Sequence, residues 1–213
     1  MSLGAQRLLA FLGPQSDGAH RGAAAQQLWP DYPNHRAAAN LRSALCRGRR
    51  TGRIPLVDCI GQRLRLSPLI RVDLHTVGVD ARKIVDGPGP PPGDAEALID
   101  DLTQELLPGW TDEWLDLDRE RWDQLRLYAF EGLAQRLLTA GQYLPALQAA
   151  LTAIAIDPIR ETAQRIVIEI HLAEGNVVSA VLRYQHYSEF LSRELNVSPS
   201  PQMISLLPGL LSA

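Results

Sequence analysis

The stretch from Arg119 to Pro199 repeats itself, and this repetition limits what the chain can fold into. Gly141 and Gly175 lie 34 positions apart. The same offset brings similar residues together at four further pairs: Leu138 and Leu172, Ala146 and Ala180, Leu147 and Val181, Ile156 and Phe190. A period of about 34 residues is typical of stacked units of two helices each, because one unit alone cannot bury its apolar face. We therefore expect this stretch to form antiparallel helix pairs.

The first unit matches the tetratricopeptide (TPR) pattern. Gly141 stands where one helix ends and the chain reverses, a place that favours the left-handed backbone that glycine adopts without strain. Ala146 and Ala153 allow the two helices to lie close together, and Tyr143 fills the wedge beside the turn. Pro158 ends the second helix because it lacks an N–H. The second unit is degenerate, and an ordinary helical bundle rich in Ala and Leu is the alternative that the shared offsets disfavour.

Charge is divided unequally between the two ends of the chain. Residues 1–72 contain eleven Arg, no Lys and three acidic residues, a net charge of +8, whereas residues 73–213 carry a net charge of −11. A cationic domain joined to an anionic one is expected when the first touches a polyanion. Two domains that attract each other would give the same pattern. We predict two domains, residues 1–72 and residues 73–213.

Several classes of protein are disfavoured by what the sequence contains. No apolar run approaches the ~18 residues of a membrane helix, and Met1 is not followed by a signal core, so we expect a cytoplasmic protein with no membrane partner. Cys46 and Cys59 fit neither a disulfide framework nor a zinc site and are predicted to be buried thiols. The five histidines are scattered, and no HExxH, GxSxG or phosphate-binding glycine loop occurs. We expect no enzymatic activity, no metal and no cofactor.

Three short helices are predicted in the first fifty residues, at positions 3–12, 21–28 and 35–50. The third has two faces at about 100° per residue. Its apolar face consists of Ala37, Ala38, Leu41, Ala44 and Leu45, and its polar face of Arg36, Asn40, Ser43, Arg47 and Arg50. Arg suits phosphates and the acceptor edge of guanine, and Asn can pair with adenine. The polar face therefore suits a helix that lies in the major groove of double-stranded DNA.

A basic hairpin is predicted between residues 54 and 66, with its turn near Gly61. Alternation along its second strand points Arg63 and Arg65 outward, and Leu64 and Leu66 inward. Three helices followed by such a hairpin is the order of a winged helix. In that arrangement the third helix enters the groove, and Arg63 and Arg65 on the wing hold flanking phosphates.

Six stretches of the chain resemble SARP-type bacterial transcriptional regulators. They are Leu28-Trp29-Pro30-Asp31, Ala39-Asn40-Leu41-Arg42, Val72-Asp73-Leu74, Leu107-Pro108-Gly109-Trp110, Asp157-Pro158 and Glu194-Leu195-Asn196-Val197-Ser198-Pro199-Ser200-Pro201. The resemblance implies an OmpR-like winged helix, as in two-component effector domains, followed by a bacterial transcriptional activation domain. The expected fold is mainly α: a winged helix-turn-helix of three helices and a short β-hairpin, followed by a TPR-like helical domain.

The chain departs from this family at two places. It begins about where the first helix of the family begins, so we expect it to lack the N-terminal β-sheet and the wing to lose its pairing strands; an isolated hairpin is marginal in water. Gly48 also occupies an inward position of the third helix where the family has leucine. We expect this to cost about 1 kcal/mol of helix propensity and ~2 kcal/mol of burial.

The helical half begins less clearly than it continues. Residues 69–85 show no clear pattern, and residues 87–93, which are all Gly or Pro, are predicted to be a loop. Further helices are predicted near positions 94–106, 118–139, 143–157, 160–174 and 177–195. Stacked helix pairs present a concave face for a peptide or protein, and we place Arg183, Tyr184 and Tyr187 on it.

Two functions remain open. In the first, the chain is a transcriptional activator that binds promoter DNA through the winged helix, while its TPR-like half contacts the transcription machinery or another protein, or forms a homodimer. In the second, it is a TPR-type protein-interaction module whose truncated winged helix no longer binds DNA.

Overall fold

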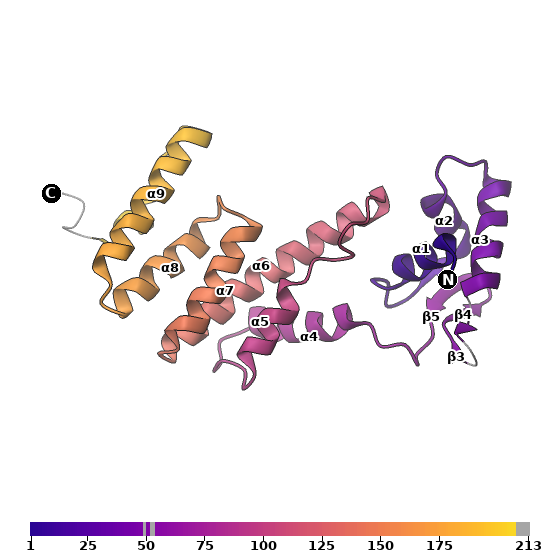
Figure 1. The fold of residues 1–213 in the computed structure, drawn as a ribbon, viewed down its shortest axis with the longest axis horizontal. Coiled ribbons are helices and arrows are strands. Elements are labelled where there is room, and N and C mark those ends of the chain that lie inside the picture. The colour runs from indigo at the N-terminus through magenta and orange to yellow at the C-terminus, as the bar shows by residue number, and fades with distance from the viewer. Residues whose placement is uncertain (49, 52–53, 208–213) are drawn as a thin grey trace. The chain divides into compact units, whose positions relative to one another are not determined.

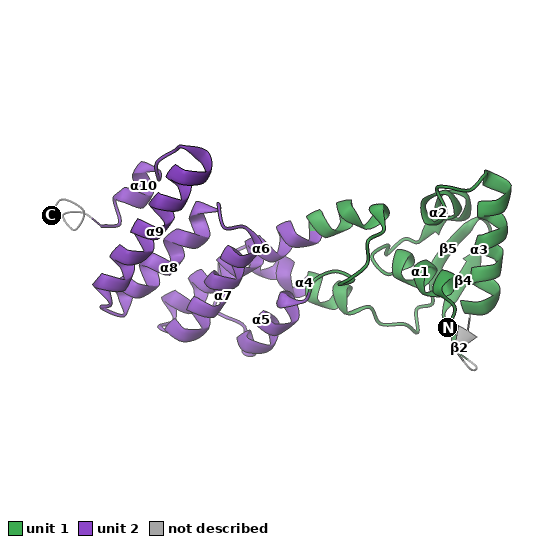
Figure 2. Cartoon of the chain, turned by 45° about the horizontal axis from the view of Figure 1, so that its top comes forward, with its two compact units in different colours: residues 1–78, 105–121 green, residues 79–104, 122–213 purple. Residues whose placement is uncertain are grey.

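The computed structural model describes residues 1–48, 50–51 and 54–207. The described chain is mainly helical, with a few short strands near its N-terminus (Figure 1). It divides into two compact units: unit 1 contains residues 1–78 and 105–121, and unit 2 contains residues 79–104 and 122–213 (Figure 2). The predicted fold class, a winged helix followed by TPR-like helices, is confirmed.

Unit 1 has the element order of a winged helix. Its helices are α1 (Leu3–Leu12), α2 (Arg21–Leu28) and α3 (Asn34–Gly48), and α4 begins in it. Its strands are β1 (Ala19–His20), β2 (Arg50–Thr51), β3 (Ile54–Pro55), β4 (Val57–Ile60) and β5 (Arg63–Leu66). The predicted bounds of α1 and α2 are confirmed, and β4 and β5 turn at Gly61 as expected. The third helix ends at Gly48, because the chain at position 50 already belongs to β2.

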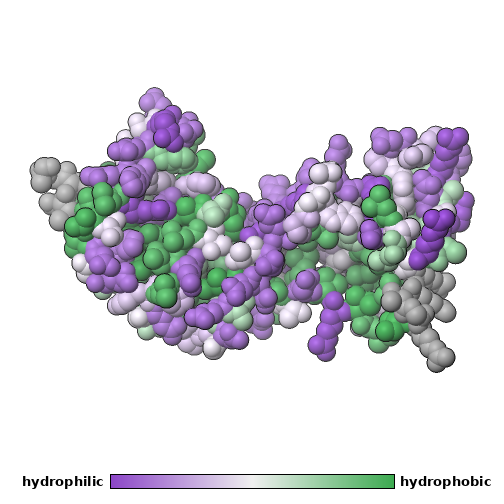
Figure 3. All heavy atoms as spheres, in the orientation of Figure 1, coloured by the Kyte–Doolittle hydropathy of each residue, from purple (hydrophilic) through white to green (hydrophobic). Residues whose placement is uncertain are grey.

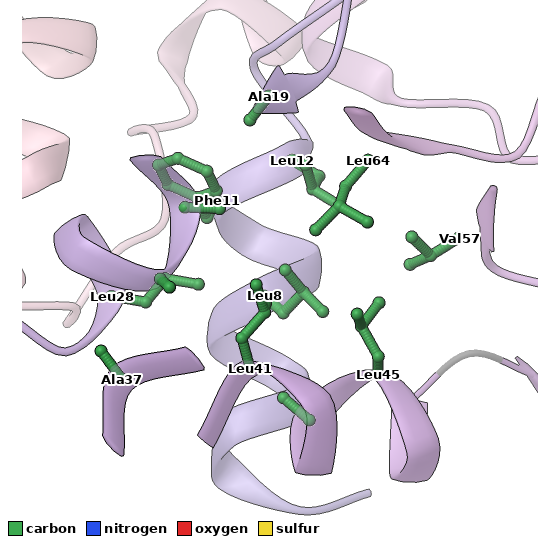
Figure 4. Close-up of a cluster of buried hydrophobic side chains, with 13 residues drawn as sticks. Leu8, Phe11, Leu12, Ala19, Leu28, Ala37, Leu41, Leu45, Val57 and Leu64 are labelled. Atoms are coloured by element: carbon green, nitrogen blue, oxygen red, sulfur yellow. The ribbon is translucent and has the colours of Figure 1, made fainter. Parts of the chain in front are cut away.

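The core of unit 1 lies between the three helices and the sheet (Figure 4). Leu8, Leu12, Leu28, Leu41 and Leu64 are each at most 1% exposed, and they come from every one of these layers. Full burial of a leucine side chain contributes roughly 1.5–3 kcal/mol, so this cluster accounts for a large share of the unit's stability. The apolar face predicted for α3 points into it.

The wing hairpin has a third strand, which corrects the expectation that it would be unsupported. β1 pairs with β5 in antiparallel register, Ala19 opposite Leu64 and His20 opposite Arg63, giving a three-stranded sheet with the order β1-β5-β4. Gly18 makes this pairing possible, because its φ is +69° and a Cβ there would lie 2.3 Å from the Leu64 carbonyl oxygen. The sequence indicated this pairing only through Gly18, a glycine shortly before the helix predicted at positions 21–28.

Gly48 also corrects an expectation. It is buried, and a Cβ at this position would lie 2.5 Å from the Cβ of Ala5 on α1. Position 48 is therefore a place where α1 and α3 approach closely, and the absence of a leucine there leaves no cavity. Small residues at both positions allow α1 and α3 to pack more tightly than larger side chains would permit.

Residues 105–121 belong to unit 1 although they lie far along the chain. Asp112 forms an ion pair with Arg7 of α1, and the Trp114 ring meets the Phe11 ring edge to face, with centroids 5.2 Å apart. Arg119 secures the segment by donating to the carbonyl oxygens of Leu106, Leu107 and Trp110. We call residues 105–121 the strap.

The remaining elements are helical. They are α4 (Asp73–Val85), α5 (Ala95–Thr103), η1 (Glu113–Leu115), α6 (Asp116–Thr139), α7 (Tyr143–Ile156), α8 (Glu161–Ala173), α9 (Val177–Leu195) and α10 (Pro201–Ile204). α4 occupies most of the stretch that showed no clear pattern. The other predicted helices occur within three residues of their expected ends, and Asp94 caps α5 by accepting from the Ala97 N–H.

The two repeat turns are equivalent. Gly141 and Gly175 have φ values of +73° and +78°. Each glycine N–H bonds to the carbonyl three residues before it at 3.0 Å, and the next residue's N–H bonds to the carbonyl five residues before that residue, at 2.9 Å and 2.8 Å. This is the Schellman arrangement of a helix end. Ala146 and Ala180, which follow these turns, are both fully buried.

The loop of residues 87–93 is held by Arg136 of α6. Its guanidinium donates to the carbonyl oxygens of Lys83, Ile84, Gly87 and Pro90, with distances of 3.2 Å to Lys83 and 2.9 Å to Ile84. A cation at a helix C-terminus satisfies carbonyls that lack an intrahelical partner. Arg136 thus ends α4 and positions the loop after it.

The cysteines are both exposed, Cys46 on α3 and Cys59 on β4, so the prediction of buried thiols was wrong. For Cys46 the exposure agrees with helical periodicity, because at about 100° per residue this position lies away from the apolar face of α3. Among the residues with described positions, no helix is both long and apolar enough to cross a membrane. No cluster of three or more His, Cys, Asp or Glu side chains that could hold a metal is found in the same residues.

Candidate nucleic-acid interface

The polar face of α3 is exposed. α3 packs against α1 and α2, and its inward residues Leu41 and Ala44 are at most 3% exposed. On the opposite side Arg36, Ser43 and Arg47 are exposed and Asn40 is half-buried. Hydrophilic side chains line the outer edge of this helix in Figure 3. The structure thus brings four of the five predicted groove residues onto one face; the Arg50 side chain lies outside the described residues.

The wing presents two further arginines. Arg63 and Arg65 are exposed on β5, on either side of the fully buried Leu64. Arg65 lies opposite Asp58 of β4, but their charged groups are 3.8 Å apart and both side chains are at least 32% exposed. An exposed pair at this distance is worth little and would yield to a phosphate. Both wing residues are therefore placed as predicted.

Most arginines of this surface have no acidic partner. Arg7 pairs with Asp112, yet Arg36, Arg47 and Arg63 have no carboxylate within 4.0 Å in the described part of the chain. Unpaired guanidinium groups keep their full attraction for an external anion. These three arginines are therefore available to an external anion.

Two arginines that sequence reasoning missed lie beside this face. Arg21 at the start of α2 and Arg42 on α3 line a cavity of about 390 Å³ between the two helices. Arg42 falls outside the polar stripe of α3, and Arg21 belongs to a helix without a clear polar face. For Arg42 the available signal was the absence of any acid between positions 32 and 57, a stretch that does not include Arg21.

The predicted protein-binding stripe on α9 is mostly internal. Tyr187 is 3% exposed, and its hydroxyl donates to the Ile159 carbonyl oxygen at 2.7 Å. Burial raises the pKa of Tyr187 to about 12. Arg183 is half-buried and donates to Gln164 at 2.9 Å, and burial lowers its pKa. Tyr184 packs against the apolar cluster that contains Tyr187. The placement of Tyr187 on an open surface was wrong, because the position that holds alanine in the first repeat is a core position.

The C-terminal signature stretch closes the last helix pair. Asn196 ends α9 in the left-handed conformation, with φ of +54°. Ser200 caps α10 by accepting from the Met203 N–H, and both its N–H and its hydroxyl donate to the Glu161 carboxylate of α8. Asn196 thus ends one helix and Ser200 begins the next. The role of the stretch in the structure is architectural.

Comparison with known proteins agrees with these features. The family model described as the bacterial transcriptional activator domain matches residues 95–211. No curated protein matches the sequence. Among solved structures, the chain is similar to Mycobacterium tuberculosis EmbR in complex with a low-affinity phosphopeptide, with a TM-score of 0.65 and 16% identity. The match covers 99% of this chain and 59% of the EmbR chain, so this chain spans less than two thirds of that structure.

A likeness at this level of identity shows a shared fold, whereas the family model covers more than half of the chain. The repeat turns of unit 2 lie within the residues that the family model matches, and the winged-helix order of unit 1 agrees with the structural match. The chain therefore belongs to the bacterial transcriptional activator domain family, as its resemblance to SARP-type regulators predicted.

Proposed function

We infer that the chain binds promoter DNA through unit 1, with α3 in the major groove. The observation that carries this proposal is the exposed face of α3, where Arg36 and Arg47 lie without an acidic partner in the described chain. Between them Asn40 and Ser43 supply the amide and hydroxyl groups that bond to base edges. Arg50 continues the same stripe in the sequence. A helix face that carries unpaired arginines and an amide side chain suits double-stranded DNA.

The wing would hold the flanking backbone. Arg63 and Arg65 share one face of β5, and the three-stranded sheet supports them. Phosphate contacts fix the register of a protein on the duplex, whereas base contacts specify sequence. We assign Arg63 and Arg65 to phosphates and Asn40 to base recognition. A regulator that works on promoter DNA would act in the bacterial cytoplasm.

Unit 2 would contact a protein. Stacked helix pairs offer an extended surface, and the candidate partners are the transcription machinery, another protein or a second copy of this chain. Arg183 and Tyr184 remain the proposed contact residues on α9, each half-buried. No catalytic role is proposed.

The rival function, a TPR-type interaction module with an inactive winged helix, depended on an unsupported wing and a weakened third helix. β1 supports the wing, and Gly48 is closely packed. Both reasons for the rival are therefore weaker, and it becomes one outcome of the experiment below.

The test is selection of bound sequences from random duplex DNA at two salt concentrations. With six or more phosphate contacts, affinity should fall about 10³-fold or more between about 50 mM and 200 mM salt. Arg36→Gln with Arg47→Gln should weaken binding to all sequences, and Asn40→Ala should relax preference at one position by about 1–3 kcal/mol.

The matched control is Arg82→Gln with Arg193→Gln, which removes the same charge from exposed positions of unit 2. It should bind as the unaltered chain does. Failure to bind any duplex, or binding that ignores salt, would refute the proposal and favour the protein-interaction module.

A further inference from the structure

The cavity between α2 and α3 has the composition of an anion site. It measures about 390 Å³ and is lined by two arginines, three amide side chains and an apolar floor. The lining residues used here are Arg21, Arg42, Gln26, Asn34 and Gln62. No acidic residue lines it, so its net charge is that of the two guanidinium groups.

Neither arginine is used by the fold. Within the described residues, the side chains of Arg21 and Arg42 form no ion pair and no hydrogen bond. Arg21 contributes to the structure through its backbone, whose N–H donates to the Gln62 carbonyl oxygen at 2.8 Å. This bond holds the start of α2 against the turn between β4 and β5. The rim of the cavity is thus positioned while its guanidinium groups stay free.

The amides add directed hydrogen bonding. Gln26 of α2 donates to Asn34 of α3 at 3.4 Å across the cavity wall, and Gln62 completes the rim from the wing. Guanidinium groups present paired N–H donors that match the oxygens of a phosphoryl group, and amides supply further donors. A neutral or cationic ligand would leave the two arginines uncompensated.

We propose that this cavity binds a phosphoryl group through Arg21 and Arg42. Its two sources are a backbone phosphate of DNA and a free phosphate species. The DNA source rests on the function proposed above, and the register of β1 supports it: His20, the residue before Arg21, lies opposite Arg63 of the wing. The arginines of the cavity therefore extend the cationic row of the wing, Arg63 and Arg65, toward α3.

The DNA arm compares the full-length chain with Arg21→Gln/Arg42→Gln. Each lost phosphate contact reduces the slope of log K against log salt by about 0.9. Because the two arginines hold one phosphate, the double variant loses one contact, and the advantage of the unaltered chain should shrink about 3.5-fold between about 50 mM and 200 mM salt. Arg82→Gln/Arg193→Gln removes the same charge elsewhere and should keep the full slope.

The free-phosphate arm titrates inorganic phosphate into the full-length chain and follows backbone amide resonances, with sodium chloride of equal ionic strength as reference. Saturable shifts at α2, the start of α3 and the β4–β5 turn are expected. The double glutamine variant should lose them, and Arg21→Lys/Arg42→Lys should weaken them, because lysine keeps the charge without the paired donors. Circular dichroism melting checks that each variant is folded.

The outcomes separate the sources. A reduced salt slope supports a DNA phosphate, and saturable phosphate shifts with an unchanged slope support a free phosphate species. If the unaltered chain binds no DNA yet binds phosphate through both arginines, the proposed function fails and the anion site stands. An unchanged slope together with no saturable shift in the unaltered chain overturns the site.

Discussion

Arg160, in the turn between α7 and α8, binds both carboxylate oxygens of Glu131 on α6, with N–O distances of 2.6 Å and 2.8 Å. The same guanidinium lies over the Tyr128 ring, 4.4 Å from its centroid. Hydrogen bonding to Glu131 raises the pKa of Arg160. Since Glu131 is only 7% exposed, this pair joins the α7–α8 turn to α6 through a well-shielded interaction.

Replacement of Glu131 by alanine should lower the free energy of unfolding by about 3 kcal/mol, because it leaves a partly buried guanidinium without its partner. Chemical denaturation measures this change. The control is Glu194→Ala, which breaks the pair with Arg193. The side chains of Arg193 and Glu194 are 72% and 49% exposed, so the loss of this pair should cost under about 0.5 kcal/mol. Equal losses in both variants would show that burial of the Arg160 pair contributes nothing.

Tyr187 should make unit 2 sensitive to alkali. Its folded-state pKa of about 12 lies above the value of 10.0 for free tyrosine, so the stability it contributes is complete below pH 10 and is lost as pH rises through 12. In that window the free energy of unfolding should fall by about 1.4 kcal/mol per pH unit from this group alone. Tyr187→Phe should cost about 1 kcal/mol at neutral pH through the lost hydrogen bond, and should flatten the alkaline fall. Parallel alkaline slopes for the two proteins would contradict the assignment.

Gly48→Ala should destabilise unit 1 by about 1–3 kcal/mol, because the new methyl group overlaps the Cβ of Ala5. Adding Ala5→Gly should recover part of this loss, and a double-mutant cycle measured by urea denaturation gives the coupling. Gly93→Ala is the control, since a Cβ there meets no atom within 4 Å. Its stability should be unchanged or slightly raised. Leucine at position 48, which the family resemblance favours, should be worse than alanine.

The strap should stabilise unit 1. Trp114→Ala removes the ring that packs on Phe11 and the core, and is expected to cost about 3 kcal/mol. Amide hydrogen exchange should speed up in α1 more than in α8, because the lost contact belongs to unit 1. Leu117→Ala, at a position 54% exposed in the same strap, should change stability by less than about 0.5 kcal/mol. If exchange in α1 matches the unaltered chain, the strap is dispensable.

Local patterns predicted well what depends on local interactions. The bounds of α1, α2 and α9 followed from apolar periodicity and from breaking residues, and the outward direction of Arg63 and Arg65 followed from alternation. The left-handed turns at Gly141 and Gly175 followed from one repeat offset. The sequence interpretation missed α4, although its buried residues Val77, Ala81 and Ile84 recur at helical spacing. It also misplaced Tyr187, whose burial depends on a repeat position rather than on residue type.

From the sequence alone came the helical repeat, the winged-helix order and the cationic face of α3, because each can be read from residue spacing and element order along the chain. Only the tertiary structure decided that β1 supports the wing, that Gly48 rests on Ala5, that the strap belongs with α1, and that Arg21 and Arg42 line one cavity. These relationships join residues that are distant along the chain. The closeness of such residues is set by how helices and strands pack in three dimensions, and no periodicity in a single stretch records it.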